Sequence, residues 1–252
     1  MIQAITFDFW DTLVVDDSDE PKRAAMGLPA KPQARLQLLL DEIASHSPEI
    51  EPDQVARAFE HANQRFRHSW DNDYSTPTVT SRLLEVYDFL NISATPGLAD
   101  VVREIEEMEV RIPPDFVPGV HGVIAELAQS YKLAIISDTI HTTGRGIRQL
   151  LESRDLLRHF HTFVFSDESG ASKPAPAVFE KAASNLGVPL TEIVHVGDRE
   201  SNDVEGPLAM GMKAILFTGV VDRGSANSRA IAVCKDLLEL PAIIRNLDKE
   251  DP

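Results

Sequence analysis

Beyond residue 114 the chain alternates short apolar runs with helix-like stretches, and this alternation limits its fold more than any other feature of the sequence. The apolar runs are too short for core helices, and their composition is typical of buried strands. They cover residues 132–137, 161–166, 192–197 and 213–217. The helix-like stretches cover residues 120–130, 144–153, 175–186 and 202–210. This pattern predicts right-handed crossovers and a parallel sheet covered on both faces.

One further strand-like run, at residues 2–9, lies far from the others in the sequence. After it the strand-like runs disappear, and apolar residues recur at helical spacing in stretches that prolines separate. Because one strand precedes this helical region and the others follow it, we expect an α/β fold with an insertion. The expected Rossmann-like core comprises residues 1–15 and 114–252, and the inserted α-helical domain comprises residues 16–113.

The composition excludes several classes of protein. The chain has 40 Asp and Glu against 24 Lys and Arg, and its formal net charge of −16 makes nucleic acid a poor partner. The single cysteine, Cys234, has no partner for an internal disulfide, and the N-terminus lacks the features of a signal peptide. No apolar run approaches the roughly 20 residues that span a bilayer. We expect a cytoplasmic monomer or homodimer that binds neither nucleic acid nor membranes.

Acidic and hydroxyl side chains follow three of the expected strands. Asp8 ends the first strand, Ser137 and Asp138 end the second, and Asp198 ends a later one, with Asp203 shortly behind it. In open parallel sheets the ligand site lies beyond the carboxyl ends of the strands. The sequence therefore predicts that these side chains share one crevice.

Carboxylates gathered in one crevice repel one another unless a cation binds or some of them stay protonated. Oxygen ligands without Cys or His suit Mg²⁺, which also accepts waters and phosphate oxygens. A carboxylate is a possible covalent nucleophile toward phosphorus, and a lysine such as Lys173 can neutralise the oxygens of the transferred group. Ser137 can donate a hydrogen bond to the same group.

The residues around these strand ends resemble four motifs of the haloacid dehalogenase superfamily, a group of hydrolases that is mostly phosphatases. Residues 8–13, Asp-Phe-Trp-Asp-Thr-Leu, are similar to its first motif, Asp-x-Asp-Gly-Thr-Leu. The second motif resembles residues 135–138, the third 172–176, and the fourth 195–198 with 202–203 and 209–212. All four stand in the family's order, which is far more specific than one motif alone.

The resemblance implies a role for each motif residue. Asp8 is expected to be the nucleophile, and Ser137 and Lys173 are expected to hold the transferred group. Thr12 is expected to support the loop that carries the nucleophile.

The resemblance also implies a cofactor, Mg²⁺, and a substrate site. Asp8, Asp198 and the main-chain carbonyl of Trp10 are expected to ligate the ion, with Asp203 in its outer shell. The expected substrate is a small anionic molecule, and the residues expected to surround it are Trp10, Asp11, Asp138 and Arg65.

The helical insertion is similar to the cap that the superfamily carries after its first motif. Within it His61, Arg65 and His68 fall near one helical face. This face either closes over the crevice and recognises an anionic substrate, or it is a solvated face with Phe66 and Trp70 packed inward. The spacing favours the second interpretation.

One residue departs from the family's pattern. Its phosphatases have a second acid two residues after the nucleophile, which protonates the leaving group, and here Trp10 holds that position. An indole cannot transfer a proton near pH 7, and loss of a general acid typically lowers the rate by about 10² to 10⁴. Asp11 is adjacent but occupies the family's glycine position and is expected to point elsewhere.

Trp10 leaves three functions open. We favour a Mg²⁺-dependent phosphatase of small phosphorylated metabolites that forms an aspartyl-phosphate and works best on good leaving groups. The superfamily's 2-haloacid dehalogenases also have an aromatic residue at this position, but they use no metal and lack the acidic pair of Asp198 and Asp203. The third possibility is a catalytically weak protein that binds a phosphorylated ligand or a protein partner.

Overall fold

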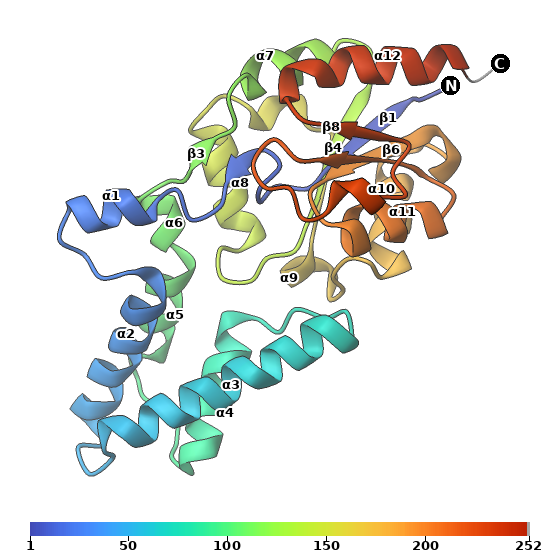
Figure 1. Cartoon of the computed structure of the whole chain (residues 1–252). Coiled ribbons are helices and arrows are strands. Elements are labelled where there is room, and N and C mark those ends of the chain that lie inside the picture. Colours follow the sequence, from blue (N-terminus) through green and yellow to red (C-terminus); the bar gives the residue numbers. More distant parts are fainter. Residues whose placement is uncertain (251–252) are drawn as a thin grey trace.

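The computed structural model describes residues 1–250, which form a parallel sheet flanked by helices and, beside it, a group of helices from the first half of the chain (Figure 1). Six strands make the sheet in the order β5-β4-β1-β6-β7-β8, and every neighbouring pair is parallel. They are β1 Ala4–Phe7, β4 Lys132–Ser137, β5 Thr162–Phe165, β6 Ile193–Gly197, β7 Lys213–Phe217 and β8 Ala232–Cys234. The expected α/β fold with its parallel sheet is confirmed.

Alternate residues of each strand face opposite sides of the sheet, and each side packs on its own helices. In β4, Leu133 and Ile135 belong to the apolar core under one group of helices, and Ala134 and Ile136 belong to the core under another. The first group is α7 Val120–Leu127, α8 Gly144–Glu152 and α12 Leu240–Glu250, and the second side is covered by α10 Pro176–Leu186. Burial on both faces explains why the strands are continuous apolar runs.

The helices of the insertion pack around an apolar core that is separate from the cores of the sheet. They are α1 Glu20–Ala25, α2 Lys31–His46, α3 Pro52–Asn72, α4 Val79–Leu90, α5 Leu98–Glu106 and α6 Met108–Arg111. The longest of them, α3, begins where the sequence favours a helix start, because a proline opens it and Glu51 forms a capping box with Gln54.

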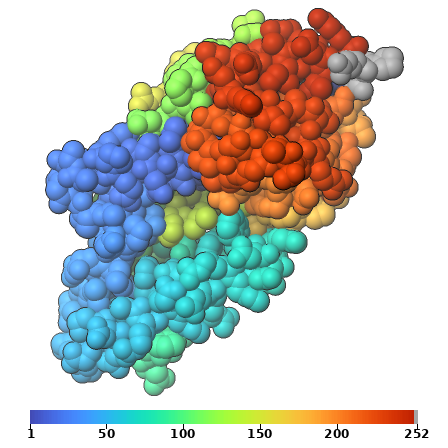
Figure 2. Space-filling model, in the orientation of Figure 1, coloured from blue at the N-terminus to red at the C-terminus, as the bar shows by residue number. Residues whose placement is uncertain are grey.

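A short ribbon connects the insertion to the sheet. Strand β2, Val14–Val15, pairs antiparallel with β3, Asp115–Phe116, so the chain leaves the sheet region and returns to it at neighbouring points. The helical group and the sheet then form two lobes that meet along one side (Figure 2). Among residues 1–250, no helix combines the length and the apolar composition that crossing a bilayer demands.

Several elements differ from the expected ones. The first strand is shorter than residues 2–9, and neither β8 nor the β2–β3 ribbon was predicted. In place of one helix over 202–210 there is a π-helix, Glu200–Glu205, followed by α11, Gly206–Ala209. One further short helix, α9 Ser166–Ser169, follows β5.

Candidate active site

Asp8 lies at the centre of the site because it follows β1, whose neighbours are β4 and β6. Its backbone N–H donates to the carbonyl of Val196 at 2.9 Å, which continues the pairing with β6 beyond the strand. Lys173 places its Nζ 2.8 Å from Asp8 Oδ1 and 2.6 Å from Asp203 Oδ1. The lysine is only 3% exposed, so its charge is compensated by these two carboxylates rather than by water.

A chain of hydrogen bonds behind Asp203 fixes the lysine. His195 is buried, and desolvation lowers its pKa, so the ring is neutral at pH 7. Its Nε2 donates to Asp203 Oδ1 at 3.1 Å, and its Nδ1, 2.8 Å from Thr6 Oγ1, accepts from that hydroxyl. Burial by itself raises the pKa of Asp203, but Lys173 and His195 outweigh it and hold this pKa below its usual range. Asp203 is therefore an ionised anchor for Lys173.

Asp203 reaches this position because its segment lies very close to the end of β6. Gly197, the last residue of β6, lies so close to Asp203 that a Cβ on the glycine would meet the Asp203 Cγ at 2.3 Å. The other oxygen of Asp203, Oδ2, accepts from the backbone N–H of Arg199 at 2.9 Å. The glycine is needed here to admit the carboxylate under the strand end.

Asp198 completes a cluster of three carboxylates. Ligand atoms of Asp8, Asp198 and Asp203 all lie within 4.8 Å of one another. Burial, with the negative charges of Asp8 and Asp203, raises the pKa of Asp198 to about 7. Arg223 partly compensates this charge, because its Nε lies 2.7 Å from Asp198 Oδ2.

The donor set of this cluster fits Mg²⁺. All the donors are carboxylate oxygens, the ligands this ion prefers, and a cation would relieve the repulsion that raises the pKa of Asp198. Both oxygens of Asp203 already accept hydrogen bonds from the protein. Asp8 and Asp198 could therefore hold the ion directly, with Asp203 behind them.

Within residues 1–250, two buried hydroxyls on the segments that follow β1 and end β4 have no hydrogen-bond partner. They are Thr12 Oγ1, on the loop after β1, and Ser137 Oγ, at the end of β4. A buried hydroxyl without a partner is costly, and native proteins usually satisfy it with a protein group, a water or a ligand. Ser137 is at the strand end beside Asp8, where it can donate to an anion held there.

Asp138 connects the core to the insertion. Its Oδ1 accepts from the backbone N–H of Lys173 at 3.0 Å, and its Oδ2 accepts from Trp70 Nε1, at the end of α3, at 3.1 Å. Burial raises the pKa of Asp138 to about 6. Because both oxygens are occupied, Asp138 positions the Lys173 loop and Trp70.

Asp11 is held by two partners of its own. It has the left-handed backbone conformation, with φ of 52°, which Asp tolerates better than most residues. Its Oδ1 accepts from the backbone N–H of Asp16 at 3.0 Å, and its Oδ2 lies 2.7 Å from Arg223. Arg223 therefore links Asp11 to Asp198.

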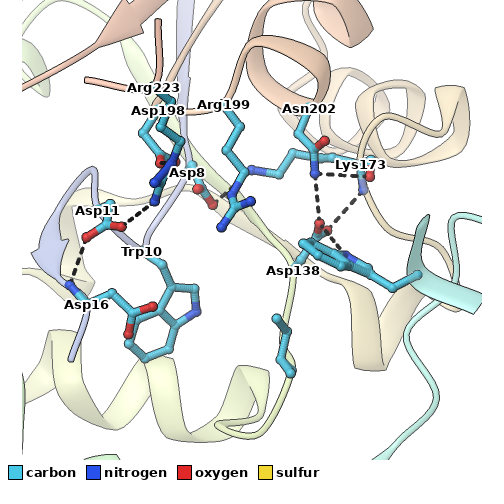
Figure 3. A pocket seen from close by; sticks show the side chains of 12 residues that line it. Asp8, Trp10, Asp11, Asp16, Asp138, Lys173, Asp198, Arg199, Asn202 and Arg223 are labelled. Atoms are coloured by element: carbon cyan, nitrogen blue, oxygen red, sulfur yellow. Dashed lines mark hydrogen bonds and ion pairs between the residues drawn. The ribbon is translucent and has the colours of Figure 1, made fainter. Parts of the chain in front are cut away.

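A cavity lies between the sheet and the insertion, and Asp8, Lys173 and Asp198 line it, whereas Asp203, Thr12 and Ser137 are not among its lining residues (Figure 3). Its walls are formed by Asp8, Trp10, Asp11, Asp16, Trp70, Asp138, Ile140, Lys173, Asp198, Arg199, Asn202 and Arg223. Six of these residues were not expected at the site: Asp16, Trp70, Ile140, Arg199, Asn202 and Arg223. No motif marks Arg223, since it lies in a loop far from the other residues in the sequence.

The basic face of α3 lies outside this cavity. Arg65 is 63% exposed on its side chain and pairs with Glu85 at 2.9 Å, His61 stacks on Phe89, and His68 contacts Asn72. The structure therefore does not bring Arg65 to the expected substrate residues, because its charge is already matched on the surface of the insertion.

Trp10 stands at the wall where the family's phosphatases have their second acid. Its ring packs edge-to-face on Phe9, with centroids 5.0 Å apart, and it is partly exposed to the cavity. Trp70, on the opposite lobe, has the guanidinium of Arg199 over its ring at 5.6 Å. The cavity thus combines a charged end at Asp8 with two indoles.

Comparison with solved structures shows the same fold. The chain is similar to a 2-haloacid dehalogenase from Pseudomonas syringae, with a TM-score of 0.69 and 20% identity over 98% of this chain and 100% of the other. It is also similar to a haloacid dehalogenase-type phosphatase from Thermococcus onnurineus, with a TM-score of 0.64 and 22% identity over 96% of this chain and 98% of the other.

Sequence relatives cover less of the chain. A glyceraldehyde 3-phosphate phosphatase from Pyrococcus abyssi is 35% identical over 40% of this chain and 42% of its own length. The human haloacid dehalogenase-like hydrolase domain-containing protein 3 is 24% identical over 69% of this chain and 71% of its own length. The mouse N-acylneuraminate-9-phosphatase is 28% identical over 51% of this chain and 52% of its own length.

The model of the haloacid dehalogenase-like hydrolase family matches residues 2–211, which include the nucleophile loop, the insertion and all the motif residues described above except Met212. The chain therefore belongs to the haloacid dehalogenase-like hydrolases.

Proposed function

We propose that this hydrolase is a Mg²⁺-dependent phosphatase of small phosphorylated molecules and that Asp8 is its nucleophile. The observation that carries this proposal is the carboxylate of Asp8, ion-paired with buried Lys173 and within 4.8 Å of two further carboxylates. A carboxylate beside a fixed cation is suited to attack an anionic phosphoryl group, because the cation offsets the repulsion between them.

In the proposed reaction the Asp8 carboxylate attacks phosphorus, and the bond from phosphorus to the leaving oxygen breaks with its electron pair. Lys173 Nζ and the Ser137 hydroxyl donate hydrogen bonds to the transferred group. Water then attacks phosphorus of the aspartyl-phosphate, which restores the Asp8 carboxylate and releases inorganic phosphate. Asp8 and Asp198 would hold Mg²⁺, which would supply positive charge to offset that of the phosphoryl group.

Trp10 determines which substrates suit this site. It has no proton to give to a leaving oxygen near pH 7, so the enzyme should favour leaving groups that are stable as anions. Acyl phosphates, anhydrides and aryl phosphates meet this condition, and simple sugar phosphates do not. The named phosphatases among the relatives support the reaction type, and they do not identify the substrate.

A phosphate-release screen with and without Mg²⁺ tests the proposal. We expect release from acetyl phosphate or phenyl phosphate that requires Mg²⁺ and disappears in Asp8→Asn. Faster release from simple sugar phosphates than from acetyl phosphate would contradict the leaving-group preference. Trp10→Asp, which restores the family's acid, should raise turnover of sugar phosphates.

Trp10 also supports a second function, hydrolysis of 2-haloacids, because halide leaves without a proton. Asp198 and Asp203 weigh against it, since that reaction has no use for a metal-binding carboxylate pair. Halide release that persists in EDTA would favour the dehalogenase. Tight binding of a phosphorylated ligand without any turnover would favour the third possibility, a binding protein.

A further inference from the structure

Both tryptophans of the chain line the cavity at Asp8, although they lie 60 positions apart in the sequence and in different lobes. Trp10 follows the nucleophile, and Trp70 ends α3. An indole offers a large flat apolar face, and it costs little conformational entropy when a ligand orders it. The cavity is therefore built to contact more of a substrate than its phosphoryl group.

A second cavity adjoins the first one, and Trp10, Asp16 and Ile140 line both. The volume at Asp8 is about 60 Å³, and the adjoining volume is about 290 Å³. Since one water takes up about 30 Å³ of liquid and a cavity of about 150 Å³ can hold benzene, only the adjoining cavity admits a ring. The Trp10 indole stands between a space for the phosphoryl group and a space for the leaving group.

The charges around the adjoining cavity define what it accepts. Four carboxylates line it, from Asp16, Asp17, Glu20 and Glu109, and Lys31 pairs with two of them. A second anionic group on the substrate would be repelled by this wall. The leaving group that fits here carries no anionic substituent, and Arg35 on the same wall offsets part of the charge on the oxygen that departs.

One polar group in this cavity has an unmet hydrogen bond. Arg35 is 9% exposed, and its Nε has no hydrogen-bond partner. It lines the adjoining cavity together with Pro32, also from the insertion, and His141, which follows β4 of the sheet. A buried N–H without a partner is costly, so an acceptor on a ligand at this wall would be favourable.

Resting on the phosphatase function above, we propose that the substrate is a phosphate monoester of an uncharged planar aromatic alcohol. Its ring lies in the adjoining cavity against the Trp10 indole, with a hydrogen-bond acceptor toward Arg35. Asp8 attacks phosphorus, the phosphorus–oxygen bond breaks, and the aryl oxygen leaves with the electron pair. The ring stabilises that anion, so the step needs no proton donor at the position of Trp10.

The test uses two phosphonates of similar size, because a phosphonate binds but is not hydrolysed. Phenylphosphonate is planar and cyclohexylphosphonate is not. Since only Trp10 and Trp70 fluoresce as indoles, quenching of intrinsic fluorescence in the presence of Mg²⁺ reports binding in this cavity. We expect phenylphosphonate to bind about two- to twelvefold more tightly, the range expected of one aromatic pair.

Three variants separate the contributions. Trp10→Phe keeps an aromatic face and should keep the selectivity, whereas Trp10→Leu should abolish it. Trp70→Phe leaves Trp10 as the reporter and should still show quenching. Isothermal titration with the same phosphonates measures Trp10→Leu, which lacks that reporter.

Equal binding of the two phosphonates would overturn the inference. So would rapid hydrolysis of glycerol phosphate that is lost in Asp16→Asn, because a proton would then come from Asp16 at the junction of the cavities. The two proposals fail separately. Selective phenylphosphonate binding without phosphate release from phenyl phosphate contradicts the proposed function, and phosphate release without aromatic selectivity contradicts only this inference.

Discussion

The two lobes contribute very different walls to the active-site cavity. On the sheet side, charged groups are each held by several partners, as Asp203 is by Lys173, His195 and a backbone N–H. On the insertion side, the cavity is lined by Asp16 and Trp70. Hydrogen bonds from Trp70 to Asp138, from the backbone N–H of Ser172 to the carbonyl of Tyr74 and from Arg82 to the carbonyl of Ile140 connect the lobes near the site.

This difference suggests that the sheet side carries out the reaction and that the insertion side binds the substrate. A buried network of charges is costly to disturb, because each member leaves another uncompensated. A wall that depends on one indole can change with small cost to folding. We therefore expect changes on the sheet side to affect turnover and stability together, and changes on the insertion side to affect substrate binding alone.

The largest effect is expected for Lys173→Met. Two buried carboxylates, Asp8 and Asp203, lose their cation, so the free energy of unfolding should fall by about 3–5 kcal/mol. Turnover should fall by about 10² to 10³, as when a fixed group that stabilises transition-state charge is removed. Urea unfolding and kcat measure the two effects. A variant that loses activity but keeps its stability would contradict the role of Lys173 in holding the site together.

A second effect links Mg²⁺ to pH through Asp198. Its raised pKa of about 7 means that the metal-free folded protein retains a proton that the unfolded chain releases, so this group lowers the free energy of unfolding as pH rises from about 4 to 7. Mg²⁺ requires the ionised carboxyl, so its apparent affinity should be about tenfold weaker at pH 6 than at pH 8.

The rise in Tm on adding Mg²⁺ measures this affinity. It should be larger at pH 8 than at pH 6 and disappear in Asp198→Asn. Asp11→Asn is the matched control, since Asp11 shares Arg223 with Asp198 and lies outside the carboxylate cluster. A Tm rise that does not depend on pH would argue against Asp198 as a ligand.

On the insertion side, Trp70→Phe should have a moderate effect. It removes the donor to Asp138 and keeps an aromatic ring, a loss of about 1 kcal/mol. KM should therefore rise about three- to tenfold, while kcat and Tm remain nearly unchanged. Phe89→Leu alters an exposed aromatic on the same lobe, away from the cavity, and should leave KM as it is. A large fall in kcat for Trp70→Phe would show that the two walls are not separable.

The smallest effect is expected for Arg65→Ala. Its exposed pair with Glu85 should contribute less than about 0.5 kcal/mol to stability. Because Arg65 is not among the residues that line the cavity, KM should also stay within experimental error. A clear rise in KM would show that the basic face of α3 does bind the substrate.

Local patterns predicted the sheet because strand formation depends on short apolar runs. The expected bounds of β4 and β7 match the observed Lys132–Ser137 and Lys213–Phe217. Strand β8 was not identified, since its three residues are too few for a period to show. The π-helix Glu200–Glu205 was also not predicted, because it depends on the contact of Asp203 with Lys173 and His195 rather than on local propensity.

The site residues fall into the same two groups, those that local sequence rules predict and those that depend on tertiary contacts. Asp8, Ser137 and Asp198 follow strands, and a rule about strand ends brings them to one edge before any coordinates are known. Helical periodicity placed Arg65 on a face, but it did not predict that Glu85 would neutralise it. Arg223 reaches Asp11 and Asp198 from a loop without periodicity, so only the tertiary structure identifies it.

The central claim is that Asp8 carries the phosphoryl group during turnover. Rapid acid quenching of the reaction with acetyl phosphate and Mg²⁺, followed by borohydride reduction and peptide mass spectrometry, tests it directly. We predict conversion of Asp8 to homoserine, dependent on Mg²⁺ and absent without substrate. Turnover that leaves Asp8 unmodified, or phosphate release that survives in Asp8→Asn, would contradict the account.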